Sequence, residues 1–255
     1  MKILLANDDG IEAKGIQVLY ERLNRDKEND VYVIAPDSNR SAVSHHISMH
    51  SGYSVREYKK NQFAITGYPV DCTCLGLIGD LFDFKFDLVI SGINEGANMG
   101  TDIIYSGTCG AARQAVLSGV PGIALSVNPE LWDEEHRKNM KYEALADFAA
   151  KNLKELAALA SLEAPRIFVN VNAASLDSYK GVKYCKNLVI RDYGDKLHVD
   201  KGDGERPVVF IPGGEFPVPE ENCDAWVVKE GYIAISRVYA DPLATEIVDG
   251  MQFKL

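Results

Sequence analysis

Short aliphatic stretches alternate with a segment of helical periodicity at the start of the chain, and this alternation constrains the fold most strongly. Residues 2–6 read KILLA and residues 30–35 read DVYVIA, and both stretches are typical of buried strands. Between them, residues 14–23 (KGIQVLYERL) repeat apolar side chains at helical spacing. The order strand, helix, strand predicts a parallel βαβ unit with a right-handed crossover.

Later segments continue this pattern of strands and helices. We expect further strands over residues 86–90, 122–127 and 166–172. We expect helices over residues 69–77, 108–118 and 134–159. Short antiparallel strands are expected at 46–50 and 63–66, after a long loop rich in Ser and Asn. The whole order predicts an α/β protein with a Rossmann-like, mostly parallel sheet and flanking helices.

The last third of the chain has a different character. From about residue 180 helical periodicity is lost, and residues 200–219 are rich in Gly, Pro and charge. We therefore expect residues 1–175 to form a Rossmann-like catalytic core. Residues 176–255 are expected to form a β-rich extension for oligomerisation, with a return segment to the core and an antiparallel β-hairpin. The sequence places this hairpin around Glu230 and Gly231.

The charge of this 255-residue chain indicates its partners, and its cysteine content indicates its compartment. The 37 acidic residues exceed the 27 basic ones and give a net charge of −10, which disfavours nucleic acid polymers and anionic membranes as partners. The five cysteines are odd in number and scattered, which favours free thiols in a reducing compartment. No apolar stretch reaches the roughly 18 residues of a membrane span. We expect a cytoplasmic protein.

Two adjacent carboxylates, Asp8 and Asp9, directly follow the first expected strand and precede Gly10. Left alone, the two like charges would repel each other and raise one pKa. A divalent cation would remove this cost, since Mg²⁺ prefers oxygen ligands such as carboxylates. The alternative is that the stretch is only a turn and a helix cap, where Asp and Gly are common.

Polar loops follow the neighbouring strands as well. Residues 37–41 offer hydroxyl groups and a guanidinium, residues 91–94 offer an amide, and residues 106–108 begin an expected helix. Ligands of open α/β sheets bind beyond the carboxyl ends of the strands, where these loops meet. Free N–H groups at a helix N-terminus favour an anion such as phosphate. The sequence therefore predicts a cation site beside an oxyanion site.

Four motifs also carry a resemblance to a known family. They are NDDG at 7–10, APDSNRSAVSH at 35–45, GYPVDC at 67–72 and SGINEGANMGTDIIYSGT at 91–108. In this order and spacing they resemble the SurE family, the survival-protein nucleotidases. The resemblance implies a metal-dependent phosphatase acting on nucleoside 5′- and 3′-monophosphates, with short polyphosphate as a further substrate of some members. It also implies one divalent cation per subunit, Mg²⁺ or Mn²⁺, and a homodimer or homotetramer formed through an exchanged C-terminal hairpin.

The resemblance assigns roles to individual residues. The implied metal ligands are Asp8, Asp9, Ser41 and Asn94. The implied phosphate-binding residues are Asn7, Asn98, Ser106, Gly107 and Thr108. Asp8 and Asp9 are also the candidate catalytic residues, and Asp9 is the better candidate for orienting the attacking water.

Further polar side chains are candidates on their own chemistry. Arg40 has the guanidinium geometry for bidentate binding of a phosphate, although a surface arginine is the alternative. His45 or His46 is a candidate general acid, and the alternative is a solvated or packed histidine. The chain departs from the family pattern at residues 231–245, where Tyr239 stands near the position expected for a histidine.

These observations predict a 5′-nucleotidase, and one rival function stays open. A non-catalytic sensor of metal or nucleotide on the same fold would carry the same motif residues. Other classes fit less well. A phosphoacceptor receiver domain needs an aspartate after the strand at 86–90, where Ser91 and Gly92 stand, and a haloacid-dehalogenase phosphatase needs its two aspartates spaced differently. A dinucleotide-binding oxidoreductase needs a GxGxxG motif that NDDGIEAKG lacks.

Overall fold

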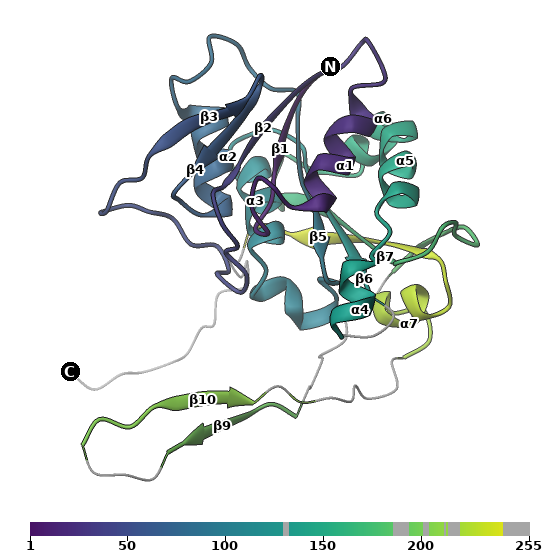
Figure 1. Cartoon of the computed structure of the whole chain (residues 1–255). Helices are drawn as coiled ribbons and strands as arrows, with labels where there is room; N and C mark the ends of the chain where they lie inside the picture. Colours follow the sequence, from purple (N-terminus) through teal and green to yellow (C-terminus); the bar gives the residue numbers. More distant parts are fainter. Residues whose placement is uncertain (130–132, 186–193, 201–203, 212, 214–219, 242–255) are drawn as a thin grey trace, which may run out of the picture.

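The computed structural model describes residues 1–129, 133–185, 194–200, 204–211, 213 and 220–241. In this part of the chain one large sheet has the strand order β3-β4-β2-β1-β5-β6-β7-β11-β8, with helices on both faces (Figure 1). The sheet begins with β1 (Lys2–Ala6), α1 (Lys14–Leu23) and β2 (Asp30–Pro36), the βαβ unit that the sequence predicts. β1 and β2 are parallel, with Ile3 opposite Val31.

Parallel pairing continues through the centre of the sheet and confirms the predicted fold class. β5 (Leu88–Glu95) pairs with β1 on one side and with β6 (Gly122–Asn128) on the other, and β7 (Ile167–Ala174) follows β6. Antiparallel pairs occur toward the edges, between β3 (Val55–Lys59) and β4 (Gln62–Ile65) and between β7 and β11 (Ile233–Tyr239). The short strand β8 (Val182–Tyr184) runs parallel to β11 at the far edge.

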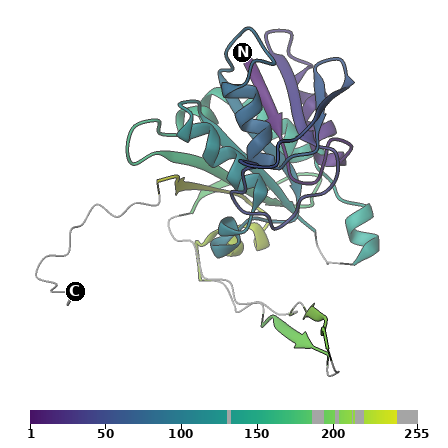
Figure 2. The ribbon, with the colours of Figure 1, turned by 90° about the vertical axis from the view of Figure 1, so that its left-hand side faces the viewer.

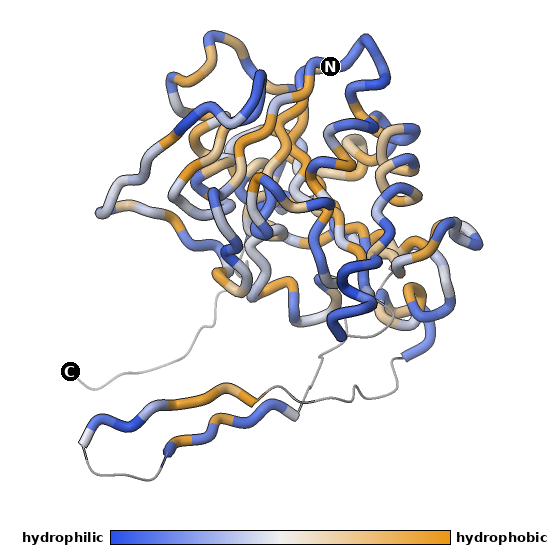
Figure 3. The backbone as a smooth tube through the Cα atoms, viewed as in Figure 1, coloured by the Kyte–Doolittle hydropathy of each residue, from blue (hydrophilic) through white to orange (hydrophobic). Residues whose placement is uncertain are grey.

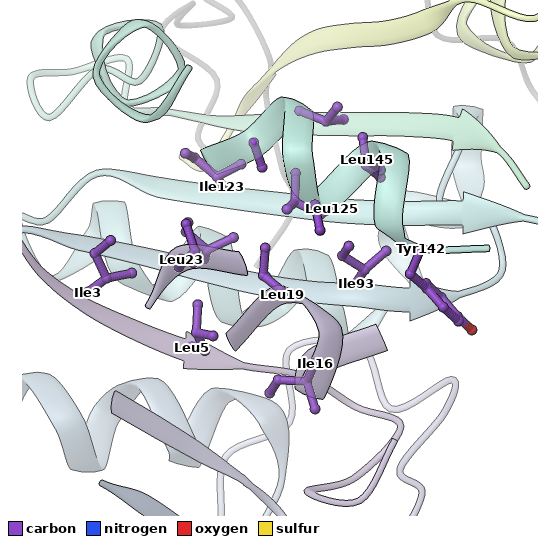
Figure 4. Packing of buried hydrophobic residues seen from close by; sticks show 14 of the residues in the cluster. Ile3, Leu5, Ile16, Leu19, Leu23, Ile93, Ile123, Leu125, Tyr142 and Leu145 are labelled. Carbon is purple, nitrogen blue, oxygen red and sulfur yellow. The ribbon is translucent and has the colours of Figure 1, made fainter. Parts of the chain in front are cut away.

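One face of the sheet is covered by α1, α5 (Glu143–Lys151) and α6 (Leu153–Ala158). Ile16, Leu19 and Leu23 recur on one side of α1 and lie against β1 and β5 (Figure 4). α1 approaches β5 very closely at Gly15, where a Cβ atom would lie 1.9 Å from the carbonyl oxygen of Ile93. Glycine at this position therefore sets the distance between helix and sheet.

The opposite face is covered by α2 (Pro69–Ile78) and α3 (Gly107–Leu117). Their small side chains, such as Ala111 and Ala115, let α3 lie close to the central strands. Two further short helices, α4 (Glu134–Lys138) and α7 (Asp224–Lys229), lie near the carboxyl ends of the strands, as does the 3₁₀ helix η1 (Gly100–Ile104). The central strands are the most apolar part of the backbone trace (Figure 3).

The antiparallel hairpin β9 (Lys196–Val199) and β10 (Val208–Ile211) forms a separate sheet. Figures 1 and 2 both show it projecting away from the main body. β8 and β11, which also lie beyond residue 175, join the large sheet instead. The division into residues 1–175 and 176–255 remains a prediction.

Four of the expected elements are wrong in extent or type. The helix expected over 134–159 is three helices, because two asparagines end the turns that precede them. The side chain of Asn139 donates to the carbonyl of Glu135 at 2.9 Å, and that of Asn152 donates to the carbonyl of Phe148 at 2.8 Å. Asparagine competes in this way with the backbone ladder of a helix.

The strand expected over 86–90 begins two residues later and continues to Glu95. It passes an irregularity between Ser91 and Asn94 and then pairs again with β6. Gly92 makes this possible with a φ of +130°, and a Cβ atom there would lie 2.2 Å from the carbonyl oxygen of Leu125. The sequence predicts that the strand ends before this glycine, whereas the glycine lies at a bulge within the strand.

Residues 46–50 do not form a strand, and a side chain of α2 binds the backbone at their centre. The carboxylate of Asp71 in α2 accepts hydrogen bonds from the backbone N–H and the hydroxyl of Ser48, at 3.0 and 2.7 Å. The hairpin expected around Glu230 and Gly231 is the end of α7 instead. Gly231 has a φ of +81° and donates to the carbonyl of Val228, as a glycine after a helix does.

Among the described residues, no helix combines the length and the apolar character needed to cross a membrane. All five cysteines are free thiols, and Cys72, Cys109 and Cys223 are buried.

Candidate active site

A cleft of about 1450 Å³ lies at the carboxyl ends of β1 and β5, where the loops after these strands meet α4 and η1. This is the edge at which an open α/β sheet binds its ligands. Six of the residues predicted from the sequence line it. They are Asp8, Asp9, Ser41, Asn94, Asn98 and Ser106.

Asp8 is buried at the bottom of this cleft and is held by the first turn of α3. Its Oδ1 accepts a hydrogen bond from the hydroxyl of Thr108 at 2.5 Å, and its Oδ2 accepts one from the backbone N–H of Thr108 at 3.2 Å. Burial raises the pKa of Asp8, and the hydrogen bonds from Thr108 oppose that rise. Gly107 is close-packed here, since a Cβ atom on it would lie 3.0 Å from Asp8 Oδ2.

Asp9 is half-buried and is held from the opposite side of the cleft. Its Oδ2 accepts a hydrogen bond from the backbone N–H of Glu95 at 2.9 Å. Burial, and next the charge of Asp8, raise the pKa of Asp9 to about 8. The side chain of Glu95 pairs with Arg137 Nε at 2.6 Å, and the charge of Arg137 partly offsets the rise in the pKa of Asp9.

The turn that carries the two aspartates is closed by Asn7. Its side chain donates to the carbonyl of Gly10 at 2.8 Å and accepts from the N–H of Gly10 at 3.2 Å. Gly10 itself has a φ of +107°, a conformation that favours glycine. Both polar atoms of the Asn7 side chain are thus used within the turn, and its predicted contact with substrate stays a prediction.

Neutral oxygen donors complete the cleft beside the carboxylates. The amide group of Asn94 donates to the carbonyl of Gly96 at 2.8 Å, which fixes the orientation of the amide and leaves its oxygen as an acceptor. Ser41 is exposed in the cleft, and its backbone N–H is held by the side chain of Asn39 at 2.9 Å. Two carboxylates with an amide and a hydroxyl oxygen are the hard donors that Mg²⁺ or Mn²⁺ prefers.

The described residues contain no group of three or more His, Cys, Asp and Glu side chains that could hold a metal ion. A cation at this edge would therefore depend on the neutral donors Asn94 and Ser41 as well as on the two aspartates. The ligand set that the sequence resemblance implies has two charged and two neutral members, and it stays a prediction.

The N-terminus of α3 forms the adjoining wall of the cleft. Ser106 is the N-cap of this helix, and its hydroxyl oxygen accepts the backbone N–H of Cys109 at 3.0 Å. Both donors of Thr108 are directed at Asp8. The dipole of the helix still favours an anion at this end. Thr108 therefore acts on Asp8 in this structure, and its predicted contact with phosphate stays a prediction.

Asn98 lies between this wall and the strands, in a network of buried amides. Its side chain donates to the hydroxyl of Ser126 at 2.8 Å, and its N–H donates to Asn172 Oδ1 at 2.8 Å. The side chains of Asn170 and Asn172 both donate to the carbonyl of Asn98, at 2.8 and 3.1 Å. The sequence reasoning missed these three partners, although polar residues inside the aliphatic strands β6 and β7 were a detectable signal.

Arg40 and the two histidines do not line the cleft. Arg40 pairs with Asp37 at 3.2 Å, and its guanidinium lies over the ring of Tyr68. His46 stacks on the same ring, with 4.0 Å between the ring centroids. His45 contacts Gln114 Oε1 at 3.0 Å, and burial lowers the pKa of its imidazole.

The sequence reasoning also overlooked residues on the outer side of the cleft. Glu95 and Arg137 come from segments expected to be a loop and the outside of a long helix, and Tyr105 stands directly before Ser106. Asp195 and Phe210, from the hairpin region, line the same cleft. The altered stretch at 231–245 is described only as far as Asp241, so its remaining residues lie outside the described part. Tyr239 is exposed at the end of β11.

Comparison with known proteins identifies relatives along the whole chain. A family model described as survival protein SurE matches residues 3–193. A Treponema pallidum protein named 5′-nucleotidase SurE is 42% identical and covers 73% of this chain and 97% of its own length. One of the same name from Pelotomaculum thermopropionicum is 36% identical, covering 99% of this chain and 94% of its own.

A solved structure agrees with the fold described above. The crystal structure of SurE protein from Aquifex aeolicus superposes with a TM-score of 0.79 at 31% identity, and 95% of each chain is covered. The predicted Rossmann-like fold with its hairpin extension is thereby confirmed.

Proposed function

The chain belongs to the SurE family, and on this premise we propose that it is a metal-dependent phosphomonoesterase. It acts as a 5′-nucleotidase, hydrolysing nucleoside 5′- and 3′-monophosphates to nucleoside and phosphate, with short polyphosphate as a further substrate. The observation that carries the proposal is the pair of carboxylates, Asp8 and Asp9, beside the N-terminus of α3 in one cleft. A cation site next to an anion site is what the hydrolysis of a phosphomonoester needs.

The residues at this edge fit one divalent cation per subunit, Mg²⁺ or Mn²⁺. We assign Asp8, Asp9, Ser41 and Asn94 as its ligands, because all four line the cleft and offer oxygen donors. Both aspartates are ionised together only when a positive charge lies close to them, since burial and next the charge of Asp8 raise the pKa of Asp9 to about 8. When bound, the cation would act as a Lewis acid on the phosphate and stabilise the negative charge of the transition state.

The protein groups around the cleft position the reactants. The N–H of Glu95 holds Asp9 Oδ2, which leaves Oδ1 to accept a hydrogen bond from the attacking water. The N-terminus of α3, at Ser106 and Gly107, would bind the oxygens of the phosphate group. Asn98, whose side chain is held by its hydrogen bond to Ser126, lines the same cleft. Arg40 is proposed to bind phosphate only if it leaves Asp37, to which it is paired here.

The β9–β10 hairpin supports an oligomer as the functional form. A two-stranded hairpin is marginally stable by itself, and its apolar side chains need a covering surface. The exposed residues are Leu197, Val199, Val208, Val209, Phe210 and Ile211. We propose that the hairpin joins subunits into a homodimer or homotetramer. Size-exclusion chromatography with light scattering on the intact chain tests this, and a monomer at micromolar concentration would contradict it.

A cytoplasmic location and small-molecule substrates fit the charge and the thiols of the chain. A net charge of −10 opposes nucleic acid polymers and anionic membranes, and the five free cysteines suit a reducing compartment. Fractionation of cells, followed by detection of the protein in the soluble and membrane fractions, tests this part of the proposal.

The proposed activity is tested by phosphate release from 5′-AMP and 3′-AMP, with Mn²⁺, with Mg²⁺ and with EDTA. We expect turnover that depends on the cation and stops with EDTA. The alternative function, a non-catalytic sensor of metal or nucleotide, predicts binding of Mn²⁺ and AMP without release of phosphate. Calorimetric titration of both ligands in parallel with the assay separates the two functions.

A further inference from the structure

Two large apolar side chains are exposed inside the cleft, directly before the N-cap of α3. Ile104 has 59% and Tyr105 has 63% of its surface exposed to solvent, and both line the cleft. The next residue, Ser106, is buried and begins the wall that favours an anion. Large exposed apolar groups in a cleft commonly mark a binding surface.

The backbone of this pair is held firmly although its side chains are exposed. Ser44 donates its hydroxyl to the carbonyl of Ile104 at 2.7 Å and its N–H to the carbonyl of Tyr105 at 2.8 Å. The N–H of Tyr105 donates to the carbonyl of Asp102 at 3.0 Å. The hydrogen bonds thus fix the position from which the tyrosine ring projects, without burying the ring itself.

We propose that Tyr105 is the stacking surface for the nucleobase, with Ile104 as its apolar neighbour. This proposal rests on the nucleotidase function proposed above. In a nucleoside monophosphate the base and the phosphate lie at opposite ends of the ribose. Tyr105 directly precedes Ser106 and both line the cleft, so the exposed ring and the proposed phosphate site are neighbours in one cleft. The two sites therefore suit the two ends of one substrate.

The other aromatic residues of the cleft serve this purpose less well. Tyr142 is only 3% exposed and is packed in the hydrophobic core, so it offers no free face (Figure 4). Phe210 is exposed but belongs to the β9–β10 hairpin, which we assign to subunit contacts. Among the described aromatic residues that line the cleft, Tyr105 is the one outside the hairpin that combines a fixed backbone with an exposed ring.

Stacking has a consequence for specificity. Every base presents a π-face, so stacking on an aromatic ring tolerates different bases and favours those with the larger ring system. The proposed surface therefore accepts all four common bases, with purines bound more tightly than pyrimidines. Stronger discrimination than this preference for purines would require hydrogen bonds to the edges of the bases.

The test compares 5′-AMP with ribose 5-phosphate, which carries the same phosphate ester and sugar without a base. We measure KM and kcat for both substrates in the full-length wild type and in Tyr105→Ala, Tyr105→Phe and Tyr184→Ala. Tyr184 is a matched control, since it is 64% exposed on β8 and does not line the cleft. Equilibrium binding of both compounds is measured by calorimetry as well.

We expect Tyr105→Ala to raise KM for 5′-AMP about 5- to 150-fold relative to ribose 5-phosphate, with kcat for 5′-AMP nearly unchanged. Tyr105→Phe retains the ring and should resemble the wild type. An unchanged ratio of the two substrates in Tyr105→Ala overturns the proposal. A loss in Tyr105→Phe equal to that in Tyr105→Ala also overturns it, because the hydroxyl would then be the recognising group.

Two further outcomes are distinguished by the same set of proteins. If the wild type releases phosphate from neither compound, the nucleotidase function fails, and the calorimetric ratio still decides whether Tyr105 binds the base. If Tyr105→Ala changes the oligomeric state seen by light scattering, and Tyr184→Ala does not, the exposed pair is a subunit contact and the proposal is overturned.

Discussion

Replacing Thr108 with valine removes the hydroxyl oxygen that contacts Asp8 and leaves the shape of the side chain nearly unchanged. The hydroxyl of Thr108 lies 2.5 Å from Asp8 Oδ1, and both residues are buried. A hydrogen bond to a charged group contributes about 1.5–3 kcal/mol, and it favours the ionised carboxylate. Its loss should raise the pKa of Asp8 further and weaken the binding of a cation by about 10- to 100-fold.

The matched control is Thr108→Ser, which keeps the hydroxyl and loses only a methyl group. Calorimetric titration with Mn²⁺ should show weak binding for the valine variant and nearly normal binding for the serine variant. The Mn²⁺ concentration that half-saturates 5′-AMP hydrolysis should rise by the same factor as the dissociation constant. Circular dichroism confirms that each variant is folded before the comparison is made.

Two results would refute this reasoning. Wild-type Mn²⁺ affinity in Thr108→Val would mean that the hydroxyl does not support Asp8 as a ligand. A low kcat that persists at saturating Mn²⁺, with unchanged Mn²⁺ affinity, would mean that Thr108 contacts the substrate instead, as the family resemblance implies. Support of Asp8 by Thr108 therefore predicts a change in Mn²⁺ affinity, whereas a contact with substrate predicts a change in kcat.

Three other substitutions test separate parts of the structure. Asp9→Asn should abolish most turnover, and near-normal activity in Mn²⁺-saturated buffer would contradict the role of Asp9 in orienting water. Asp71→Asn replaces an acceptor of two hydrogen bonds from Ser48 and should lower the free energy of unfolding by about 1.5–3 kcal/mol, measured by urea denaturation. Gly15→Ala places a methyl group 1.9 Å from the carbonyl oxygen of Ile93 and should cost about 1–3 kcal/mol; an unchanged urea midpoint would show that α1 is free to shift.

The parallel core could be predicted because its strands are short aliphatic stretches separated by clear helical periodicity. Strands covered on both faces need continuous apolar sequence, which is why β1 and β6 were found nearly to the residue. The errors have causes that periodicity does not show. Asn139 and Asn152 end helices by donating hydrogen bonds to the carbonyls four residues earlier, although the apolar pattern of residues 134–159 continues through both positions.

The position of the site was accessible from sequence for the same reason, since loops after parallel strands meet at one edge. The contacts within it were not. Thr108 reaches Asp8 across 100 residues of sequence, and Arg137 reaches Glu95 across 42. Periodicity and spacing carry no information on such pairs. His45 shows the converse, because its partner Gln114 holds the imidazole away from the cleft that the sequence suggested for it.

The charges of the protein give a second reason to propose a cation, because the phosphate substrate also needs one. A protein with a net charge of −10 repels a phosphate dianion at long range, and Asp8 and Asp9, when ionised, add to that repulsion locally. Arg137 sits on the outer side of the cleft and is engaged with Glu95, so it reduces the charge near Asp9 only indirectly. The N-terminus of α3 contributes about half an elementary charge. A divalent cation between the aspartates and the phosphate would reverse the sign of the local field, which makes substrate binding and cation binding mutually dependent in this cleft.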